Sequence, residues 1–439
     1  MNLLKLTFIL SFYLFISSCA NNNVDKTLQD TAQNISLFVN SNIENKPIIS
    51  QKQQQERAEI LIKKYFSPWT NQKPRLSLDE IKKIETEVLK KYQESPGWAG
   101  NHHPYTKSWI NQISKNADFS SFPNQHQKAI IVNATDLRLL PTQVPSYTNW
   151  HDAGEGYPFD NLQITRVVEN TPAIILQQTQ DGAWSFIQTH NLIGWVDSKA
   201  LASVDDAFIK TWMNHHYVAI TIDNNSVKDQ ANHYLFQTRI GQLFPLKGET
   251  KNNYQFLVAV SDARRKAQIE IATIEKSNAT LFPWILTEKN IAKLASRLMG
   301  APYGWGDLYG YRDCSSTLAD IFLVFGVWLP RNSTEQLSIE KNYSLKNVSN
   351  TQKLKLIKEK GIPFFSILGW PGHVMLYIGN HEGEPYVFHD KWGMVTKNIF
   401  WQEGRAVIGK TVITPLTLGK KYINVPQSFL TETTMMVVL

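Results

Sequence analysis

Cysteine is almost absent from this sequence, with only Cys19 and Cys314 among 439 residues. Two thiols can form at most one disulfide bond, which excludes a small scaffold held together by several disulfides. The chain must instead be stabilised by hydrophobic cores, for which a hydrophobic content of 42% and 21 phenylalanines are sufficient. A chain of this length is expected to form about two to four domains.

Runs of lysine and arginine are also missing. The formal net charge of +7 is modest for a chain of this length, and no basic cluster marks a surface for nucleic acid. We therefore expect no nucleic-acid partner. The small positive excess suits an anionic surface such as a cell wall or a layer of lipid headgroups.

The N-terminus carries a short apolar stretch at residues 6–16, preceded by Lys5. It is too short for a stable membrane-spanning helix and is typical of the apolar core of a signal peptide. It is followed by Ile-Ser-Ser-Cys ending at Cys19, which resembles the bacterial lipobox, whose cysteine is lipidated after cleavage. The alternative is an ordinary signal peptide with a chance cysteine. If Cys19 carries lipid, Cys314 has no disulfide partner within the chain, and a lone cysteine in an exported protein is a liability or a catalyst.

Composition and periodicity divide the chain into successive segments. Residues 21–55 are polar and rich in Asn and Gln, which is typical of a tether. Helical periodicity begins near Glu56, Ser77 and Glu80 have the spacing of a helix capping box, and strand periodicity begins near His126. We predict an α+β protein with six segments: a lipoprotein signal peptide at 1–19, a polar tether at 20–55, an N-terminal helical segment at 56–125, a first small β-barrel at 126–203, a second small β-barrel at 204–285 and a C-terminal domain at 286–439.

The first barrel is predicted from short apolar runs separated by turn residues. Residues 181–182 are an Asp-Gly hairpin turn, and a Gly-Trp-Val sequence follows at 194–196. Together with a long early loop at 143–160, these features resemble a bacterial SH3 domain. The second barrel is expected to share this architecture without an obvious sequence repeat. The long loop carries Glu155 and Tyr157, and long structureless loops in compact domains are often functional.

The residue best placed for chemistry is Cys314. A glycine-containing loop precedes it and apolar residues at helical spacing follow at 318–325, so Cys314 should lie at a helix N-terminus. There the helix dipole and the free backbone N–H groups favour a thiolate. His373 and His389 lie on two predicted neighbouring strands. We expect His373 to take the proton from Cys314 and His389 to orient the His373 ring.

Non-catalytic roles for Cys314 and the two histidines remain open. Cys314 could be a buried, inert thiol, and each histidine could be an ordinary structural residue. Zinc competes for histidine-rich sites, but no single element carries a metal-ligand pair and only one thiolate is available. We therefore predict no metal site.

Several short sequences here resemble one known family. Asp313-Cys314-Ser315, the Gly-His-Val-Met-Leu-Tyr sequence at 372–377 and the Phe-His sequence at 388–389 resemble the NlpC-type papain-like cysteine peptidases of bacterial cell-wall turnover. The resemblance is strong over residues 287–414. With the upstream barrels, the chain is similar to multidomain members that cleave γ-D-glutamyl–diamino acid bonds in murein peptides. It implies a papain-like C-terminal domain and no cofactor.

The resemblance also implies a role for each matching residue. Cys314 would be the nucleophile, His373 the base and His389 the third residue. The Tyr303 hydroxyl would stabilise the oxyanion together with the Cys314 backbone N–H. Asp313 would pair the free amine of an N-terminal L-Ala, and the residues expected to hold the substrate are Asp313, Ser315, Trp305 and Ser333.

Two positions depart from the family pattern. Ser316 stands where glycine is common, and Tyr303 lies eleven residues before Cys314, one fewer than expected. These departures bear on the geometry around the nucleophile and on the oxyanion role of the tyrosine.

The predicted function is hydrolysis of murein peptides through an acyl-enzyme on Cys314. In multidomain relatives the first barrel closes the far end of the catalytic groove. Tyr157 and Glu155 are therefore expected to line it, and the substrate should carry a free N-terminal L-Ala. The alternatives are a wall-binding scaffold with a silent catalytic domain and an acyltransferase or transpeptidase.

The expected partners are a murein peptide and, through lipid on Cys19, a membrane. We expect the protein to face the periplasm, at an outer membrane if the cell has one. The oligomeric state, the diamino acid and the role of the second barrel stay open.

Overall fold

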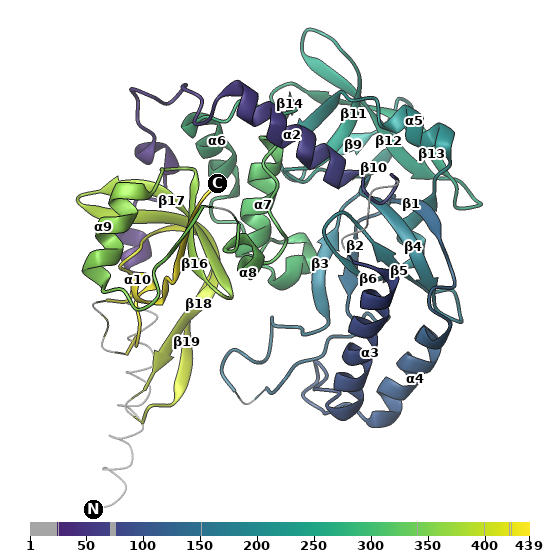
Figure 1. Ribbon diagram of the computed structural model, residues 1–439, viewed down its shortest axis with the longest axis horizontal. Helices are drawn as coiled ribbons and strands as arrows, with labels where there is room; N and C mark the ends of the chain where they lie inside the picture. The colour runs from purple at the N-terminus through teal and green to yellow at the C-terminus, as the bar shows by residue number, and fades with distance from the viewer. Residues whose placement is uncertain are drawn as a thin grey trace, which may run out of the picture.

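The computed structural model describes residues 24, 26–70, 76–150, 152–339, 341–398, 400–420, 422 and 424–439. Figure 1 shows the C-terminal domain in green and yellow beside the two β-barrels in blue and teal. Cys19 lies outside the described residues, so its lipidation stays a prediction. Within the described ranges, no helix is long and apolar enough to cross a membrane.

The N-terminal segment is helical. Its elements are η1 (Ile35–Phe38), α2 (Gln51–Tyr65), α3 (Leu78–Glu94), α4 (Lys107–Ala117) and η2 (Phe119–Ser121). The predicted capping box is confirmed at the start of α3. The Ser77 hydroxyl accepts a hydrogen bond from the Glu80 backbone N–H, and the Glu80 carboxylate accepts one from the Ser77 backbone N–H at 2.7 Å.

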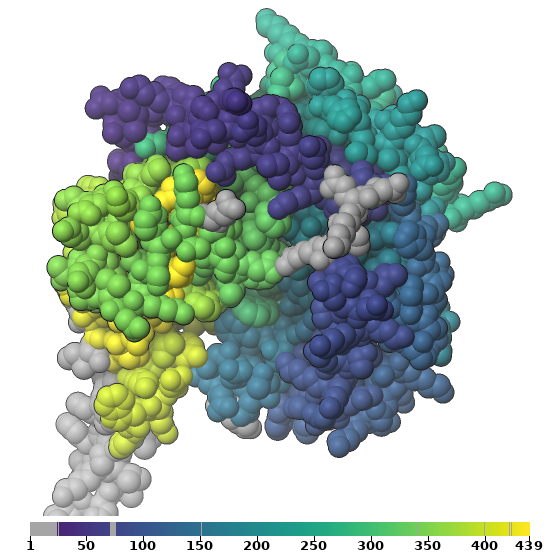
Figure 2. Space-filling model, viewed as in Figure 1, coloured from purple at the N-terminus to yellow at the C-terminus, as the bar shows by residue number. Residues whose placement is uncertain are grey.

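The stretch expected to be a polar tether is folded where the structure describes it. Val24 and Ile35 are fully buried in cores that include residues of the C-terminal domain. Helix α2 begins at Gln51, before the predicted start of the helical segment, and the Gln54 amide donates to the Phe325 carbonyl at 2.9 Å. The tether prediction is wrong here because a few apolar side chains within the polar sequence dock on distant elements. Figure 2 shows this segment in purple across the molecular surface.

The first barrel is an antiparallel sheet in the order β3-β2-β6-β5-β4-β1-β7. The predicted turn at 181–182 joins β4 to β5, and Gly182 has a φ of 71°, which favours glycine. The loop at 143–160 lies between β2 and β3 and contains no helix or strand among its described residues. The elements are β1 (Gln127–Ile131), β2 (Thr135–Arg138), β3 (Gln163–Val167), β4 (Pro172–Gln178), β5 (Trp184–Gln188), β6 (Ile193–Asp197), η3 (Ser198–Ala200) and β7 (Leu201–Ser203).

The second barrel follows helix α5 (Asp206–Trp212). It combines a five-stranded sheet, in the order β13-β12-β11-β8-β14, with a two-stranded ribbon of β10 and β9. Val218, Phe244 and Phe256 meet in its own buried core. The strands are β8 (Tyr217–Ile220), β9 (Ser226–Lys228), β10 (Tyr234–Gln237), β11 (Leu243–Glu249), β12 (Asn253–Ser261), β13 (Ala267–Glu275) and β14 (Ala279–Leu281).

The C-terminal domain is built on a six-stranded antiparallel sheet in the order β15-β20-β16-β17-β18-β19. Its strands are β15 (Asn342–Ser344), β16 (Ser366–Trp370), β17 (His373–His381), β18 (Glu384–Lys397), β19 (Glu403–Pro415) and β20 (Met435–Val438). Its helices are α6 (Glu288–Leu298), η4 (Trp305–Gly310), α7 (Cys314–Val324), α8 (Ser333–Gln336), α9 (Asn350–Lys360) and α10 (Phe429–Glu432).

Helices cover both faces of this sheet. Leu318 of α7 shares a core with Val374 of β17, whereas Phe429 of α10 shares a different core with Met375. Because consecutive strand residues point to opposite faces, α7 and α10 lie on opposite sides of the sheet. The predicted α+β class is confirmed.

Candidate active site

The sequence around Cys314 forms a well-capped helix start. Cys314 is the first residue of α7, and the Asp313 carboxylate accepts hydrogen bonds from the backbone N–H groups of Ser315 and Ser316 at 3.1 and 2.9 Å. The Ser316 hydroxyl accepts one from the Asp313 backbone N–H at 3.0 Å, which completes a capping box. Serine at 316, the first departure from the family pattern, thus has a structural role.

The thiol of Cys314 lies in a buried environment and is only 7% exposed. Burial raises its pKa to about 12, and the Asp313 carboxylate acts in the same direction. The backbone N–H of Val374 and the charge of Lys391 act in the opposite direction but do not outweigh burial. The expectation that the helix start would favour a thiolate is therefore wrong in its net direction, because desolvation exceeds the effect of the helix terminus.

The two histidines form a hydrogen-bonded chain across three strands. His373 Nε2 lies 2.9 Å from His389 Nδ1, and His389 Nε2 lies 3.0 Å from the Thr414 hydroxyl on β19. Burial is the main cause that lowers the pKa of His373 well below its usual value and that of His389 to about 3. Both rings are therefore neutral at neutral pH.

The hydrogen bonds of the chain restrict the tautomers. If His389 donates from Nε2 to Thr414, its Nδ1 accepts from His373 Nε2–H, which leaves His373 Nδ1 as a proton acceptor. The Val374 N–H that bonds to sulfur belongs to the residue next to His373, so the thiol lies beside the start of β17, while the His373 and His389 rings contact Phe429 of α10. The thiol and the His373 imidazole make no mutual hydrogen bond among the described contacts, and catalytic pairs often tighten only with substrate.

Replacing the two histidines should separate their roles. His373→Ala removes the proton acceptor and should leave almost no activity. His389→Asn can still bond to His373, so activity should fall by roughly 10- to 100-fold. The measurement is kcat on a purified murein tripeptide or tetrapeptide with each variant. If both variants lost all activity, the orienting role of His389 could not be distinguished from the role of His373 as the base.

Tyr303 lies near the same thiol. Burial, together with the charges of Asp313 and Cys314, raises the pKa of Tyr303 well above its usual value. Its hydroxyl therefore keeps its proton and remains a hydrogen-bond donor. The backbone N–H of Cys314 is also available, because the first residues of a helix have no intrahelical acceptor. These two donors fit the predicted oxyanion role.

The other residues expected to hold substrate are bonded within the protein. The Ser315 hydroxyl donates to Asp313 at 2.9 Å, and the Ser333 hydroxyl accepts from the backbone N–H of Gly372 at 3.2 Å. The Trp305 indole donates to the Asp160 carbonyl at 3.0 Å. Ser333 thus supports the backbone beside His373, and Trp305 joins the C-terminal domain to the loop of the first barrel.

Aromatic side chains from both domains meet beside Tyr303. The Trp392 ring lies 6.0 Å from Tyr303, 6.2 Å from Tyr157 and 6.3 Å from Phe159, and Phe159 lies 5.1 Å from Trp305. Tyr157 remains 53% exposed, and Glu155 is exposed without a described contact to these rings.

Sequence reasoning did not find Trp392 and Phe159. Trp392 lies at an irregularity where the β18–β19 register shifts between Lys391 and Gly393, so strand alternation from His389 does not predict its face. Phe159 lies in the long loop at 143–160. The aromatic residues of that loop are the only feature of the sequence that could have indicated its role.

Arg331 connects the helix start to a buried carboxylate. Its guanidinium lies 2.9 Å from Asp313 and 3.0 Å from Asp307, and it donates to the Thr165 hydroxyl of the first barrel at 2.6 Å. Burial alone would raise the pKa of Asp307, but Arg331 and Arg239 lower it well below its usual range. Asp307 is therefore a charged group held inside the protein.

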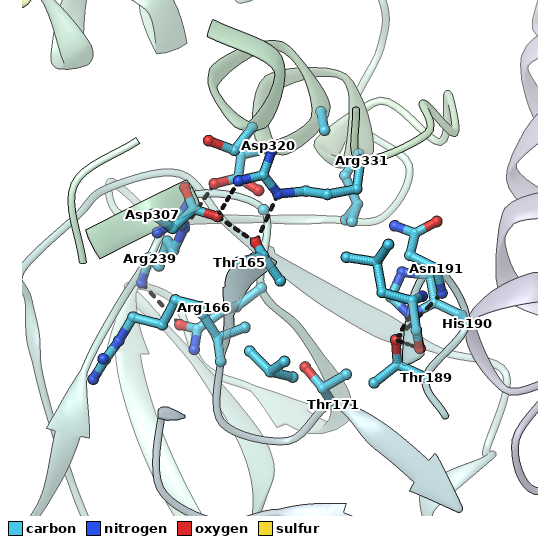
Figure 3. A pocket seen from close by; sticks show the side chains of 18 of the residues that line it. Thr165, Arg166, Thr171, Thr189, His190, Asn191, Arg239, Asp307, Asp320 and Arg331 are labelled. Carbon is cyan, nitrogen blue, oxygen red and sulfur yellow. Dashed lines mark hydrogen bonds and ion pairs between the residues drawn. The ribbon is translucent and has the colours of Figure 1, made fainter. Parts of the chain in front are cut away.

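The second barrel completes this ion network. Arg239 lies 3.0 Å from Asp307 and 2.7 Å from Asp320, while Arg312 lies 2.7 Å from Asp320 and 3.0 Å from Asp223. Figure 3 shows the labelled members of this network gathered on one side of an interdomain cavity of about 120 Å³. No sequence pattern predicted the network, because its members are scattered along the chain.

Family models match four parts of the chain. Residues 8–122 match the N-terminal NLPC_P60 stabilising domain, 145–197 an SH3 domain of the SH3b1 type, 205–251 an SH3 domain of the SH3b2 type, and 300–396 the NlpC/P60 family. Both barrels are therefore bacterial SH3 domains. The fold of the C-terminal domain and the family match over residues 300–396 agree. This domain belongs to the NlpC/P60 family.

One solved structure shows the same arrangement. An NlpC/P60 endopeptidase from Photobacterium damselae subsp. piscicida is 27% identical, with a TM-score of 0.84 over 93% of this chain and 97% of that chain. An NlpC/P60 family protein from Bacillus cereus is 17% identical over 71% of this chain and 98% of that chain, with a TM-score of 0.49, which is too distant to support an argument. No curated protein matches this chain.

Proposed function

We propose that this protein is a cysteine peptidase that hydrolyses the γ-D-glutamyl–diamino acid bond of murein stem peptides. The observation that carries the proposal is Cys314 at a capped helix start, where its sulfur bonds to the backbone N–H of Val374, the residue that follows His373 of a buried His373–His389–Thr414 chain. The likeness to the Photobacterium endopeptidase supports the peptidase class.

The site supports an acyl-enzyme route. His373 Nδ1 takes the thiol proton as the Cys314 sulfur attacks the γ-carbonyl carbon of D-Glu, and the oxyanion accepts hydrogen bonds from Tyr303 and the Cys314 N–H. His373 then donates this proton to the departing amine, which breaks the amide bond. Water next attacks the thioester, gives a proton to His373 and releases the acid as the thiol is restored. The Cys314 thiol and the His373 imidazole are both neutral before the reaction. The thiol proton therefore moves to His373 at the same time as the sulfur attacks.

The charge of the ion network favours a cationic group on the substrate. Its four carboxylates share three guanidinium groups, which leaves one negative charge among Asp223, Asp307, Asp313, Asp320, Arg239, Arg312 and Arg331. Asp390 is also buried, and burial raises its pKa well above the usual value, which weakens its contribution of negative charge. A free L-Ala ammonium near Asp313 would balance the network.

The loop at 143–160 supports a closed groove. An ideal Cβ on Gly154 would lie 2.6 Å from the Arg405 guanidinium of β19, so the loop meets the β18–β19 hairpin closely. With the aromatic contacts at Trp392, this close approach supports a groove that first-barrel residues line on one side, with little room there for a glycan. The proposed substrate is therefore a peptide already detached from glycan.

Cleavage should depend on the free amine. Free L-Ala-γ-D-Glu-diamino acid peptide should be cut at least about tenfold faster than its N-acetylated form, because acetylation removes the charge and adds bulk. The measurement is product formation by mass spectrometry, with the muramic acid-linked peptide as a second comparison. Faster cleavage of the linked peptide would contradict the closed groove and leave the first barrel as a wall-binding module.

We also propose that lipid on Cys19 holds the protein at a membrane. This proposal is supported by the apolar stretch at 6–16 and the Ile-Ser-Ser-Cys sequence that follows it. A protein that faces the periplasm in this way would meet murein peptides directly.

A further inference from the structure

The first residue that the structure describes, Val24, is close in sequence to the proposed anchor. Val24 is fully buried in a core that includes Met394 and Ala406 of the β18–β19 hairpin, and Thr27 hydrogen-bonds to Tyr422. Only five residue steps separate Val24 from Cys19, and a fully extended chain covers about 3.5 Å per step. A bilayer that holds Cys19 therefore lies within roughly 18 Å of Val24.

The same hairpin carries an exposed aromatic tip. Met394 pairs with Ala406 and Lys397 with Glu403, so the hairpin continues about 10 Å past Met394 before its turn. At the turn, Trp401 is 77% exposed, the largest value among the exposed large hydrophobic side chains that the structure describes, and Phe400 is 57% exposed. Figures 1 and 2 show the end of β18 and β19 projecting from the edge of the molecule.

The chemistry of the tip suits the boundary between headgroups and acyl chains. Tryptophan favours this boundary because it has a large apolar body and one polar N–H. The Lys397 ammonium lies 5.5 Å from the Trp401 ring, where it can meet lipid phosphates while its stem stays apolar. The negative charge of Glu403 is neutralised by an ion pair with Arg405 at 3.7 Å. Glu403 therefore does not repel an anionic lipid surface.

We propose that Trp401 and Phe400 dip into the membrane that holds Cys19, as a second contact that orients the enzyme. The partner is a phospholipid surface, and the proposal rests on the proposed anchor. One lipid anchor would leave the body free to rotate, whereas a second contact at the tip of the hairpin that also carries Trp392 would fix the direction in which the catalytic groove opens.

Fluorescence quenching tests this contact in the membrane-isolated protein. After reconstitution into phosphatidylethanolamine–phosphatidylglycerol vesicles with brominated acyl chains, wild-type emission should be quenched, and Trp401→Phe should lose most of the quenching. The matched control adds Leu281→Trp to Trp401→Phe. Leu281 is 45% exposed at the end of β14, far from the hairpin in Figure 1, so a tryptophan there should not be quenched.

Lipid labelling of wild type and Cys19→Ser separates the anchor from the tip. A labelled wild type whose quenching equals that of Trp401→Phe overturns the membrane contact alone, and an unlabelled wild type overturns both. Unchanged quenching in Trp401→Phe combined with weaker binding of that variant to purified murein sacculi would assign the tip to glycan instead.

Discussion

Cys314→Ala is expected to abolish hydrolysis and to leave the fold intact. Cys314 is the only cysteine among the residues that the structure describes, and the hydrogen-bonded chain of His373, His389 and Thr414 has no substitute for its thiol. Loss of the attacking atom should lower kcat by roughly 10⁴-fold or more. Alanine suits the first turn of a helix, so stability should change by only about 1 kcal/mol.

Activity of the purified variant on a murein tripeptide or tetrapeptide decides this prediction, with circular dichroism to verify the fold. Ser296→Ala serves as the control, because its exposed hydroxyl bonds only to the backbone of its own helix α6. Measurable turnover by a folded Cys314→Ala protein would remove Cys314 from the mechanism.

Arg331→Met should cause the largest loss of stability. It leaves Asp313 without its ion-pair partner and Asp307 with only Arg239, and both aspartates are buried residues. Removing one member of a buried ionic group usually costs about 3–5 kcal/mol because the remaining charge is uncompensated. Activity should fall as well, since Asp313 caps the helix that begins at Cys314.

Arg166→Met is the matched control for this change. Arg166 pairs with Asp136 at 3.4 Å, but the two side chains are 29% and 23% exposed. Its loss should cost less than about 1 kcal/mol. Thermal and denaturant unfolding of both variants measures the difference, and equal effects would contradict a special role for the buried network.

The network also gives the second SH3 domain a structural role. Arg239 and Asp223 come from this barrel, and they are the only second-barrel residues among the ion pairs that describe the network. Without Arg239, Asp307 and Asp320 would each lose a partner beside α7. The second barrel therefore supplies charges that stabilise helix α7.

The sequence by itself determined the local features of the site. A glycine-containing loop before apolar residues at helical spacing predicts the start of α7 at Cys314, and two histidines on strands joined by a turn predict the contact between His373 and His389. These features follow from helical and strand periodicity, which acts over a few residues. The SH3 folds were predictable for the same reason, from turn residues and alternating strands.

Only the tertiary structure decided the protonation of Cys314, the ion network and the docking of the residues after Val24. Each depends on burial or on charges brought together from distant segments, such as Arg239 and Arg331 around Asp307. The helix dipole at Cys314 is a local effect and predicts a thiolate, but desolvation depends on everything that covers the thiol. The polar stretch at residues 26–55 likewise folds because its few apolar side chains find partners that composition does not reveal.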